Sequence, residues 1–170
     1  MIEIRPECSS DIPAIHSVNA AAFERDSEAH LVDQLRDHGG LALSMVCVQD
    51  GQVIGHIAYS PVMIEFDDGG SLPALALAPV AILPEHQNSG IGTHLIQVSL
   101  DILKAQGHHL VIVLGHPDYY PRFGFKPASG FNIRSPYNVP DEAFMLLELT
   151  AGTLDNRPGV ARYRPEFDGV

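Results

Sequence analysis

Basic side chains are scarce in this chain of 170 residues: ten Lys and Arg stand against 21 Asp and Glu, giving a formal charge of −11 at pH 7. Nucleic acid and anionic membrane surfaces are bound by clustered cations, so this balance argues against both partners. No apolar run approaches the roughly 20 residues that cross a bilayer. The first residues show no basic stretch followed by a hydrophobic block, so we expect no signal peptide and a cytoplasmic location.

Cysteine is also rare, with only two in the chain. Cys8 and Cys47 cannot form a disulfide framework, and we expect both to stay reduced. With 45% apolar residues, the chain can form a core without disulfide or metal crosslinks.

No repeat, low-complexity tract or change of composition marks a domain boundary. We therefore expect residues 1–170 to form a single domain.

The apolar patterns predict an α/β (α+β) fold. A short strand opens the chain, two helices follow, and dense apolar runs separated by turns then predict further strands. Residues 91–107 have the spacing of an amphipathic helix, and the wholly apolar run after them predicts a strand covered on both faces. The predicted strands lie at residues 2–5, 43–48, 53–59 with an extension at 63–66, 72–83, 110–114 and 144–149. The predicted helices lie at 12–23, 27–38 and 91–107, with a helical turn at 119–123.

The segment most informative about function joins the strand predicted at 72–83 to the following helix. Gly90 and Gly92 lie in this segment, and glycine lets the backbone approach a ligand where a Cβ would obstruct it. Loop amides and the first unpaired N–H groups of a helix create a region of positive potential. Such a region suits phosphate or pyrophosphate. The sequence therefore predicts an anion-binding loop ahead of the helix.

Motifs for other chemistries are missing. The loop has no lysine for a Walker motif, and Leu95 stands where the dinucleotide fingerprint needs a third glycine. No Gly-x-Ser-x-Gly elbow of a serine hydrolase occurs. The histidine pair His108 and His109, and His86 and His94 near the loop, have no cysteine or paired carboxylate to complete a ligand set, so we expect no metal site.

Three segments carry a family resemblance. Gln87-x-x-Gly90-x-Gly92 matches the Arg/Gln-x-x-Gly-x-Gly/Ala motif of the GNAT (GCN5-related) N-acetyltransferases. Tyr119 to Phe125 resembles that family's acceptor-side helix and following strand, and residues 159–167 are similar to the tail of its YhbS-like branch. The likeness covers nearly the whole chain. It implies a mixed central sheet of about six to seven strands, with helices on both faces and strands splayed at the coenzyme site.

The resemblance also implies acetyl-CoA as co-substrate, without a metal. The strand backbone at Val80, Ala81 and Ile82 is expected to pair with the pantetheine arm, and one N–H there to polarise the thioester carbonyl. Main-chain amides are expected to hold the pyrophosphate, from Gln87, Asn88, Ser89, Gly90, Ile91, Gly92 and Thr93. Relatives commonly carry Lys or Arg in this loop, and this chain does not, so we expect modest coenzyme affinity.

The implied reaction is direct attack of a primary amine on the thioester. Tyr120 aligns with the tyrosine that protonates the departing thiolate in many relatives, and Tyr119 is the fallback for this general acid. His116 and Glu85 are the two candidates for a general base. A water chain, or an amine that arrives neutral, would need no base at all.

The acceptor and the activity itself are less constrained. The resemblance implies an N-acetyltransferase for a small-molecule amine, with an acceptor on a protein as a variant. A non-catalytic acyl-CoA sensor on the same fold is the alternative. Residues 129–141 belong to the region expected to select the acceptor, and Phe131 and Tyr137 there are candidates either to line a pocket or simply to cover the core. A homodimer and a monomer both stay open.

Overall fold

The computed structural model describes the backbone of residues 1–170 and the surroundings of all of them except residue 169. The chain forms two compact units. The first comprises Met1–Ser60, Ala78–Ile102 and Pro165–Val170, and the second comprises Pro61–Leu77 and Leu103–Arg164. Three elements begin in one unit and end in the other, namely strands β3 (Gln52–Phe66) and β4 (Ser71–Ile82) and helix α3 (Ile91–Ala105).

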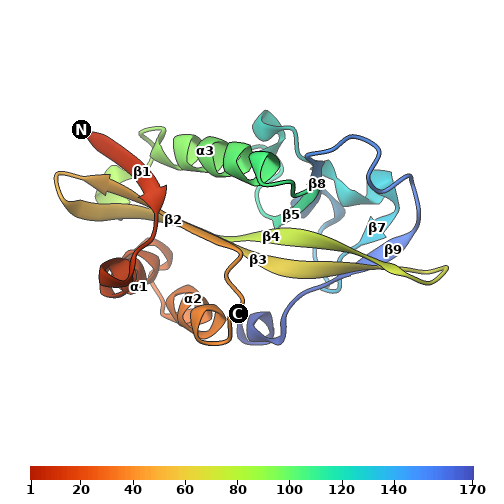
Figure 1. The fold of residues 1–170 in the computed structure, drawn as a ribbon, viewed down its shortest axis with the longest axis horizontal. Coiled ribbons are helices and arrows are strands. Elements are labelled where there is room, and N and C mark those ends of the chain that lie inside the picture. Colours follow the sequence, from red (N-terminus) through yellow and green to blue (C-terminus); the bar gives the residue numbers. More distant parts are fainter. The chain divides into compact units, whose positions relative to one another are not determined.

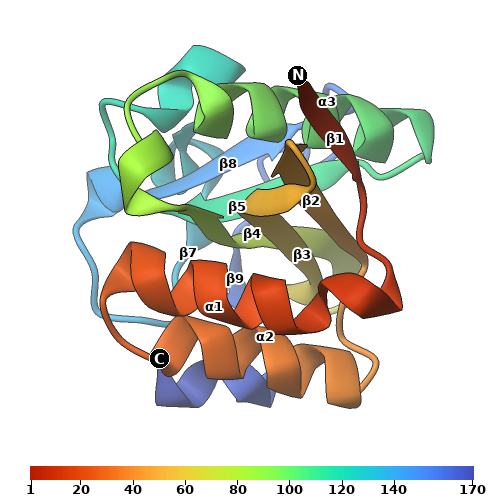
Figure 2. The same cartoon turned by 90° about the vertical axis from the view of Figure 1, so that its left-hand side faces the viewer.

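Antiparallel strands form the centre of the first unit. Besides its parts of β3, β4 and α3, the unit contains β1 (Ile2–Pro6), η1 (Ser9–Asp11), α1 (Ile12–Phe23), α2 (Ser27–Asp37), β2 (Leu43–Gln49), η2 (Pro84–His86) and η6 (Pro165–Gly169). β1 pairs with β2, and β2 pairs with β3. Helices α1 and α2 lie side by side on one face of these strands and α3 lies on the other (Figures 1 and 2). Helices therefore cover both faces, as predicted.

Local sequence explains the turns and the packing of this unit. Asp50 and Gly51 join β2 to β3 with positive φ angles of 51° and 80°, the conformation that Asp-Gly favours in tight hairpins. Ile15 and Val18 of α1 and Val32 of α2 form a buried cluster with strand residues that include Val46. Both predicted helices thus bury apolar side chains against the strands.

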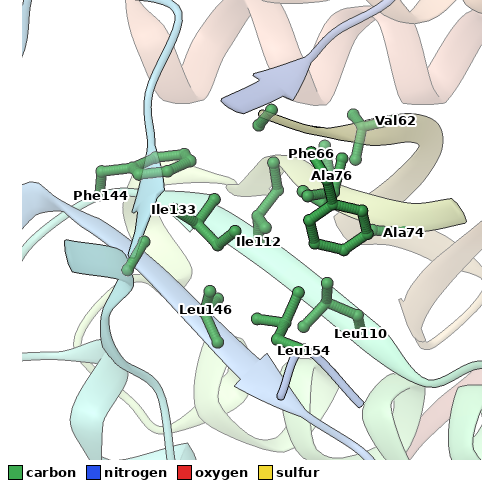
Figure 3. Close-up of a cluster of buried hydrophobic side chains, with 13 residues drawn as sticks. Val62, Phe66, Ala74, Ala76, Leu110, Ile112, Ile133, Phe144, Leu146 and Leu154 are labelled. Atoms are coloured by element: carbon green, nitrogen blue, oxygen red, sulfur yellow. The ribbon is translucent and has the colours of Figure 1, made fainter. Parts of the chain in front are cut away.

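The second unit is a sheet of mostly short strands. It contains β5 (Leu110–Leu114), η3 (Tyr120–Phe123), β6 (Lys126–Pro127), η4 (Ala128–Phe131), β7 (Ile133–Arg134), η5 (Asp141–Ala143), β8 (Phe144–Glu148) and β9 (Gly159–Arg162). β5 runs parallel to β4 and antiparallel to β8, while β9 pairs with the end of β3 and with β7. Figure 3 shows the buried cluster of this unit, in which side chains such as Ile112 and Leu146 meet those of Phe66 and Ile133.

The strand predicted at 110–114 is confirmed, and it is buried at all positions but Leu114. The predicted strand at 53–59 and its extension at 63–66 form one continuous strand, β3, and β4 continues through Pro79. The structure has nine strands where about six to seven were expected. The two-residue strands β6 and β7 are too short to show a periodicity, and β9 was not predicted as a strand.

A chain of hydrogen bonds crosses the interior of the first unit. The Ser44 hydroxyl donates to Glu7, which also accepts two hydrogen bonds of 3.0 Å from Arg36. His56 is fully buried, with Nε2 2.8 Å from Ser44 Oγ and Nδ1 3.1 Å from Asn19 Nδ2. Since Ser44 donates to Glu7, it accepts from the His56 Nε2–H, and His56 Nδ1 accepts from Asn19. The network therefore uses one neutral tautomer of His56.

This geometry predicts a pH dependence of stability. Burial lowers the pKa of His56 from 6.5 to about 4; nearby Glu7 opposes this shift and Arg36 adds to it. The unfolded chain therefore binds more protons than the folded chain between these values, and stability rises with pH. We expect the free energy of unfolding to fall by roughly 3 kcal/mol as the pH drops from about 6.5 to about 4, measured by urea unfolding.

His56→Gln is the test variant. His108→Gln is its control, because it makes the same substitution at a histidine that is only half-buried. His56→Gln should lower stability at every pH and flatten the slope above pH 4.5, and His108→Gln should leave the slope unchanged. Carboxyl groups, with reference pKa values near 4, act mainly below this window. An unchanged slope in His56→Gln would contradict the assignment of the pH dependence to His56.

Candidate functional site

The predicted anion loop lies between β4 and α3. The Gln87 side chain donates a 2.9 Å hydrogen bond from Nε2 to the carbonyl of Ile82, and the Ser89 hydroxyl donates one of 2.5 Å to the carbonyl of His86. Asn88 and Gly90 have positive φ angles of 60° and 86°. Glycine adopts this conformation readily. The loop is therefore held in a defined turn, and its residues 87–90 are exposed.

The first hydrogen bond at the start of α3 joins His94 N–H to the carbonyl of Gly90 at 3.0 Å. The amides of Ile91 and Gly92 precede it, and amides in that position have no intrahelical acceptor. The positive end of the helix dipole lies at the same place. Backbone amides and helix dipole thus give the loop the electrostatics of an anion site.

The strand that leads into this loop is well anchored. Leu83 N–H donates a 2.9 Å hydrogen bond to the carbonyl of Ile54. A Cβ on Gly55 of β3 would lie 2.8 Å from Ile82 Cδ1, so the absence of a side chain allows β3 to approach the end of β4 closely. Ala81 and Ile82 are buried and Val80 is half-buried. The parallel register with β5 joins Leu75 and Ala76 to Val111 and Ile112, ahead of Val80, Ala81 and Ile82.

Tyr120 sits at the start of η3, in the second unit, in an aromatic environment. Its ring lies edge-on to those of Tyr119 and Phe125, with centroids 5.1 and 5.7 Å away, and a Cβ on Gly115 would be 2.4 Å from its Cε2. Burial, and secondarily Tyr119, raises the pKa of Tyr120 to about 12. Its hydroxyl has no hydrogen-bond partner among the residues that the structure describes. Tyr120 is thus protonated at neutral pH and available as a donor.

Tyr119 is placed differently. The guanidinium carbon of Arg122 lies 4.3 Å from the centroid of the Tyr119 ring, and the Arg122 Nε donates a 2.8 Å hydrogen bond to the Tyr119 carbonyl. The ring is half-buried. Tyr119 therefore takes part in a local cation–π contact, whereas Tyr120 is enclosed by aromatic rings.

The two candidate bases are both exposed. Glu85 lies in η2 of the first unit and His116 follows β5 in the second. Within the described residues neither side chain forms a hydrogen bond or an ion pair. The carbonyl of His116 accepts the N–H of Tyr119 at 3.1 Å, so its backbone helps to start η3. A role for either side chain as a base stays a prediction.

The second unit also contains a cavity of about 480 Å³ beside β7 and η5. Tyr137 lines it, as the sequence suggested, whereas Phe131 packs against the hydrophobic cluster of the unit. Phe144 and Pro158 also line the cavity, although both lie outside the predicted acceptor region at residues 129–141. No group of His, Cys, Asp and Glu side chains suited to a metal ion, and no helix able to span a membrane, occurs in the part of the chain that the structure describes.

The chain belongs to the GNAT acetyltransferase family: the family model described as "Acetyltransferase (GNAT) domain" matches residues 3–128. Among curated proteins, it is 35% identical over 166 residues to the uncharacterized N-acetyltransferase YhbS of Escherichia coli K12, covering 97% of this chain and 98% of YhbS. It is 36% identical over 148 residues to the uncharacterized N-acetyltransferase YjhQ of the same strain, covering 84% and 81% of the two chains.

Solved structures give the same picture. The crystal structure of E. coli YhbS in complex with CoA superimposes with a TM-score of 0.90 at 35% identity, over 98% of this chain and 91% of that one. A GNAT acetyltransferase from Brucella melitensis in complex with acetyl-CoA gives a TM-score of 0.82 at 35% identity, over 99% of both chains. The predicted family and its mixed α/β fold are confirmed.

The loop geometry predicts binding of inorganic pyrophosphate. We expect a pyrophosphate titration to shift the amide resonances of residues 88–92 and Gly90→Ala to weaken binding several-fold. Alanine at φ +86° costs about 1–2 kcal/mol in the backbone. A Cβ at this position would meet no atom within 4 Å, so the effect would come from the backbone and not from a clash.

Gly107→Ala is the matched control. Gly107 lies beyond the other end of α3 with a φ of 89° and equally open surroundings, so it has the same backbone strain without proximity to the loop. Equal losses in both variants, or shifts confined to other residues, would contradict an anion site at residues 88–92.

Proposed function

We propose that this chain transfers the acetyl group of acetyl-CoA to a primary amine of a small molecule. The observation that carries the proposal is the exposed loop at residues 87–90, held by the Gln87 and Ser89 hydrogen bonds ahead of the amides of Ile91 and Gly92, which precede the first hydrogen bond of α3. Family membership supports it, as do the complexes of two relatives with CoA and with acetyl-CoA. Because β3, β4 and α3 continue from one unit into the other, we further propose that residues 1–170 act as one domain.

The backbone supports two positions for parts of the coenzyme. The pyrophosphate would accept hydrogen bonds from amides of residues 87–93, and the pantetheine arm would pair with the main chain of Val80, Ala81 and Ile82. β4 supports this second role, because this stretch lies beyond the residues that pair with β5. Gly55 supports it too, since the close approach of β3 fixes the end of the strand.

The chemistry requires one proton to leave the amine and one to reach the thiolate. The neutral amine nitrogen attacks the carbonyl carbon, the carbon–sulfur bond breaks, and Tyr120 donates its proton to the sulfur. The raised pKa of Tyr120 keeps its hydroxyl protonated at neutral pH, and after the thiol leaves its phenolate takes a proton back from water. The amine proton passes to water, or to His116 or Glu85, whose exposed side chains exchange readily with solvent.

Tyr120→Phe tests the proton donor. We expect kcat for acetyl transfer to fall about 100-fold, the lower end of a general acid's contribution, while the Kd for acetyl-CoA stays the same. The phenylalanine ring keeps the packing on Gly115 and Phe125. The measurements are the release of free thiol in steady state and calorimetry with acetyl-CoA.

Tyr119→Phe is the control, since the two tyrosines are neighbours with different surroundings. Its kcat should stay within about threefold of the wild-type value. A larger loss in Tyr119→Phe than in Tyr120→Phe would transfer the role to Tyr119. Equal small losses in both would remove a tyrosine acid from the mechanism.

The loop composition predicts how acetyl-CoA binding depends on salt. Residues 87–93 contain no Lys or Arg, and Lys104 lies in the last turn of α3. Binding would then depend on neutral amide donors, so we expect a micromolar Kd that changes less than about threefold between low and high salt. Calorimetry at several salt concentrations measures it. Sub-nanomolar affinity that collapses in salt would contradict this prediction.

A non-catalytic acyl-CoA sensor is the second candidate, favoured by the exposure of both candidate bases. A panel of amines that includes diamines, amino sugars and lysine peptides separates the two functions. Acetyl-CoA binding with thiol release dependent on a small amine supports the proposal, and release only with peptides points to a protein acceptor. Binding without turnover across the panel favours the sensor. No binding of acetyl-CoA would overturn both.

A further inference from the structure

The cavity of the second unit has the size of a small-molecule site. Its volume of about 480 Å³ is within the usual range for ligand pockets. It lies between β7, the loop that follows it, and η5, all within the same unit. Its walls divide into an apolar side and a polar side, which together define the chemistry of a ligand that could fill it.

The apolar side continues from the buried cluster of the unit. Ile133 and Phe144 are 2% and 4% exposed and line the cavity as well as belonging to the cluster, where Figure 3 shows them on neighbouring segments. Tyr137 and Val139 add to this wall. An apolar stretch of a ligand would therefore bury its surface against this wall, and no polar group would have to be desolvated there.

The polar side carries a net negative charge. Arg134 lines the cavity but donates two hydrogen bonds, of 3.0 and 2.9 Å, to the carboxylate of Asp67, so its charge is compensated. Asp141 accepts a 2.8 Å hydrogen bond from the Ser129 hydroxyl. Among the described residues no cationic side chain pairs with Asp141.

Asp141 differs in this respect from three other acidic side chains of the unit. Glu65, Asp67 and Asp68 each form an ion pair with an arginine, at 2.8, 2.9 and 2.9 Å. Asp141 instead faces the cavity with a neutral hydroxyl as its partner. A positively charged ligand group would supply the missing countercharge.

The cavity is connected to Tyr120 through the backbone. Gly115 N–H donates a 2.9 Å hydrogen bond to the carbonyl of Ala143, the last residue of η5, and the ring of Tyr120 lies against Gly115. η5 also carries Asp141. The η5 segment that carries Asp141 is therefore hydrogen-bonded to Gly115, and the ring of Tyr120 packs on that glycine.

On the basis of the proposed function, we propose that this cavity binds the acceptor, and that the acceptor is a diamine or another amine with a second positive group, which pairs with Asp141. The charge at Asp141 belongs to a second group because a nitrogen held as an ammonium has no lone pair with which to attack the thioester. The reacting amine is then the distant end of the same molecule. The apolar wall fits a hydrocarbon linker between the two.

Two probes of equal length test the second charge. We expect 1,5-diaminopentane to be a better acceptor than 5-amino-1-pentanol in wild type, by roughly fivefold in kcat/KM. Asp141 is exposed, and an accessible ion pair contributes this modest factor. Asp141→Asn should remove the difference by raising KM for the diamine, while the Kd for acetyl-CoA stays unchanged. Asparagine can still accept the hydrogen bond from Ser129.

Glu142→Gln is the matched control, because it removes the same charge from the next residue of η5, which is not among the cavity-lining residues. It should leave the preference for the diamine within twofold of wild type. Equal effects of the two variants would overturn the proposal, since a general electrostatic attraction would then explain the preference. A preference that persists in Asp141→Asn would also overturn it.

A binding measurement keeps the test decisive where neither probe is turned over. In a titration with 1,5-diaminopentane we expect shifts of the amide resonances of residues 129–144 in wild type and Glu142→Gln, and much weaker ones in Asp141→Asn. Shifts confined to other residues, or identical in all three proteins, would overturn the proposal. If acetyl-CoA binds and another amine is acetylated in that case, the proposed function stands while this inference fails.

Discussion

The start of α3 is the constraint on which the proposed function of this chain depends. A helix must leave its first amides without intrahelical acceptors, and here the turn at Asn88 and Gly90 presents them on an exposed loop. The proposed site thus needs no basic side chain, in a chain that has only ten of them. Under this proposal the binding energy would come from the backbone geometry, which would explain why the glycine spacing is such an informative part of the sequence.

Features fixed by local sequence were predictable. The buried strand at Leu110–Leu114, the Asp50–Gly51 turn and the three helices follow from apolar spacing and turn chemistry over a few residues. The strands β6 and β7 consist of two residues each, so their pairing with β8 and β9 is decided by distant parts of the chain. No local pattern encodes such pairings, and the sequence missed them for that reason.

The candidate site shows the same division. Its loop could be recognised from a short motif, but the features that distinguish Tyr120 from Tyr119 could not. Those features depend on how Gly115, Phe125 and Arg122 pack around the two rings, which no short motif specifies. The compensation of Arg134 by Asp67 joins residues 67 positions apart, and it is what leaves Asp141 as the uncompensated charge of the cavity. A list of charged residues in the sequence gives no indication of this.

Burial of Tyr120 and its proposed role as an acid are compatible with one environment. Aromatic neighbours that exclude water destabilise the phenolate and raise the pKa, so the same packing that stabilises the fold keeps the proton available. Over the whole reaction the amine loses one proton and the thiolate gains one. The exposed positions of Glu85 and His116 place both in contact with bulk water, which can itself accept the amine proton. A buried general base is therefore not required by the chemistry, provided that the attacking nitrogen is neutral.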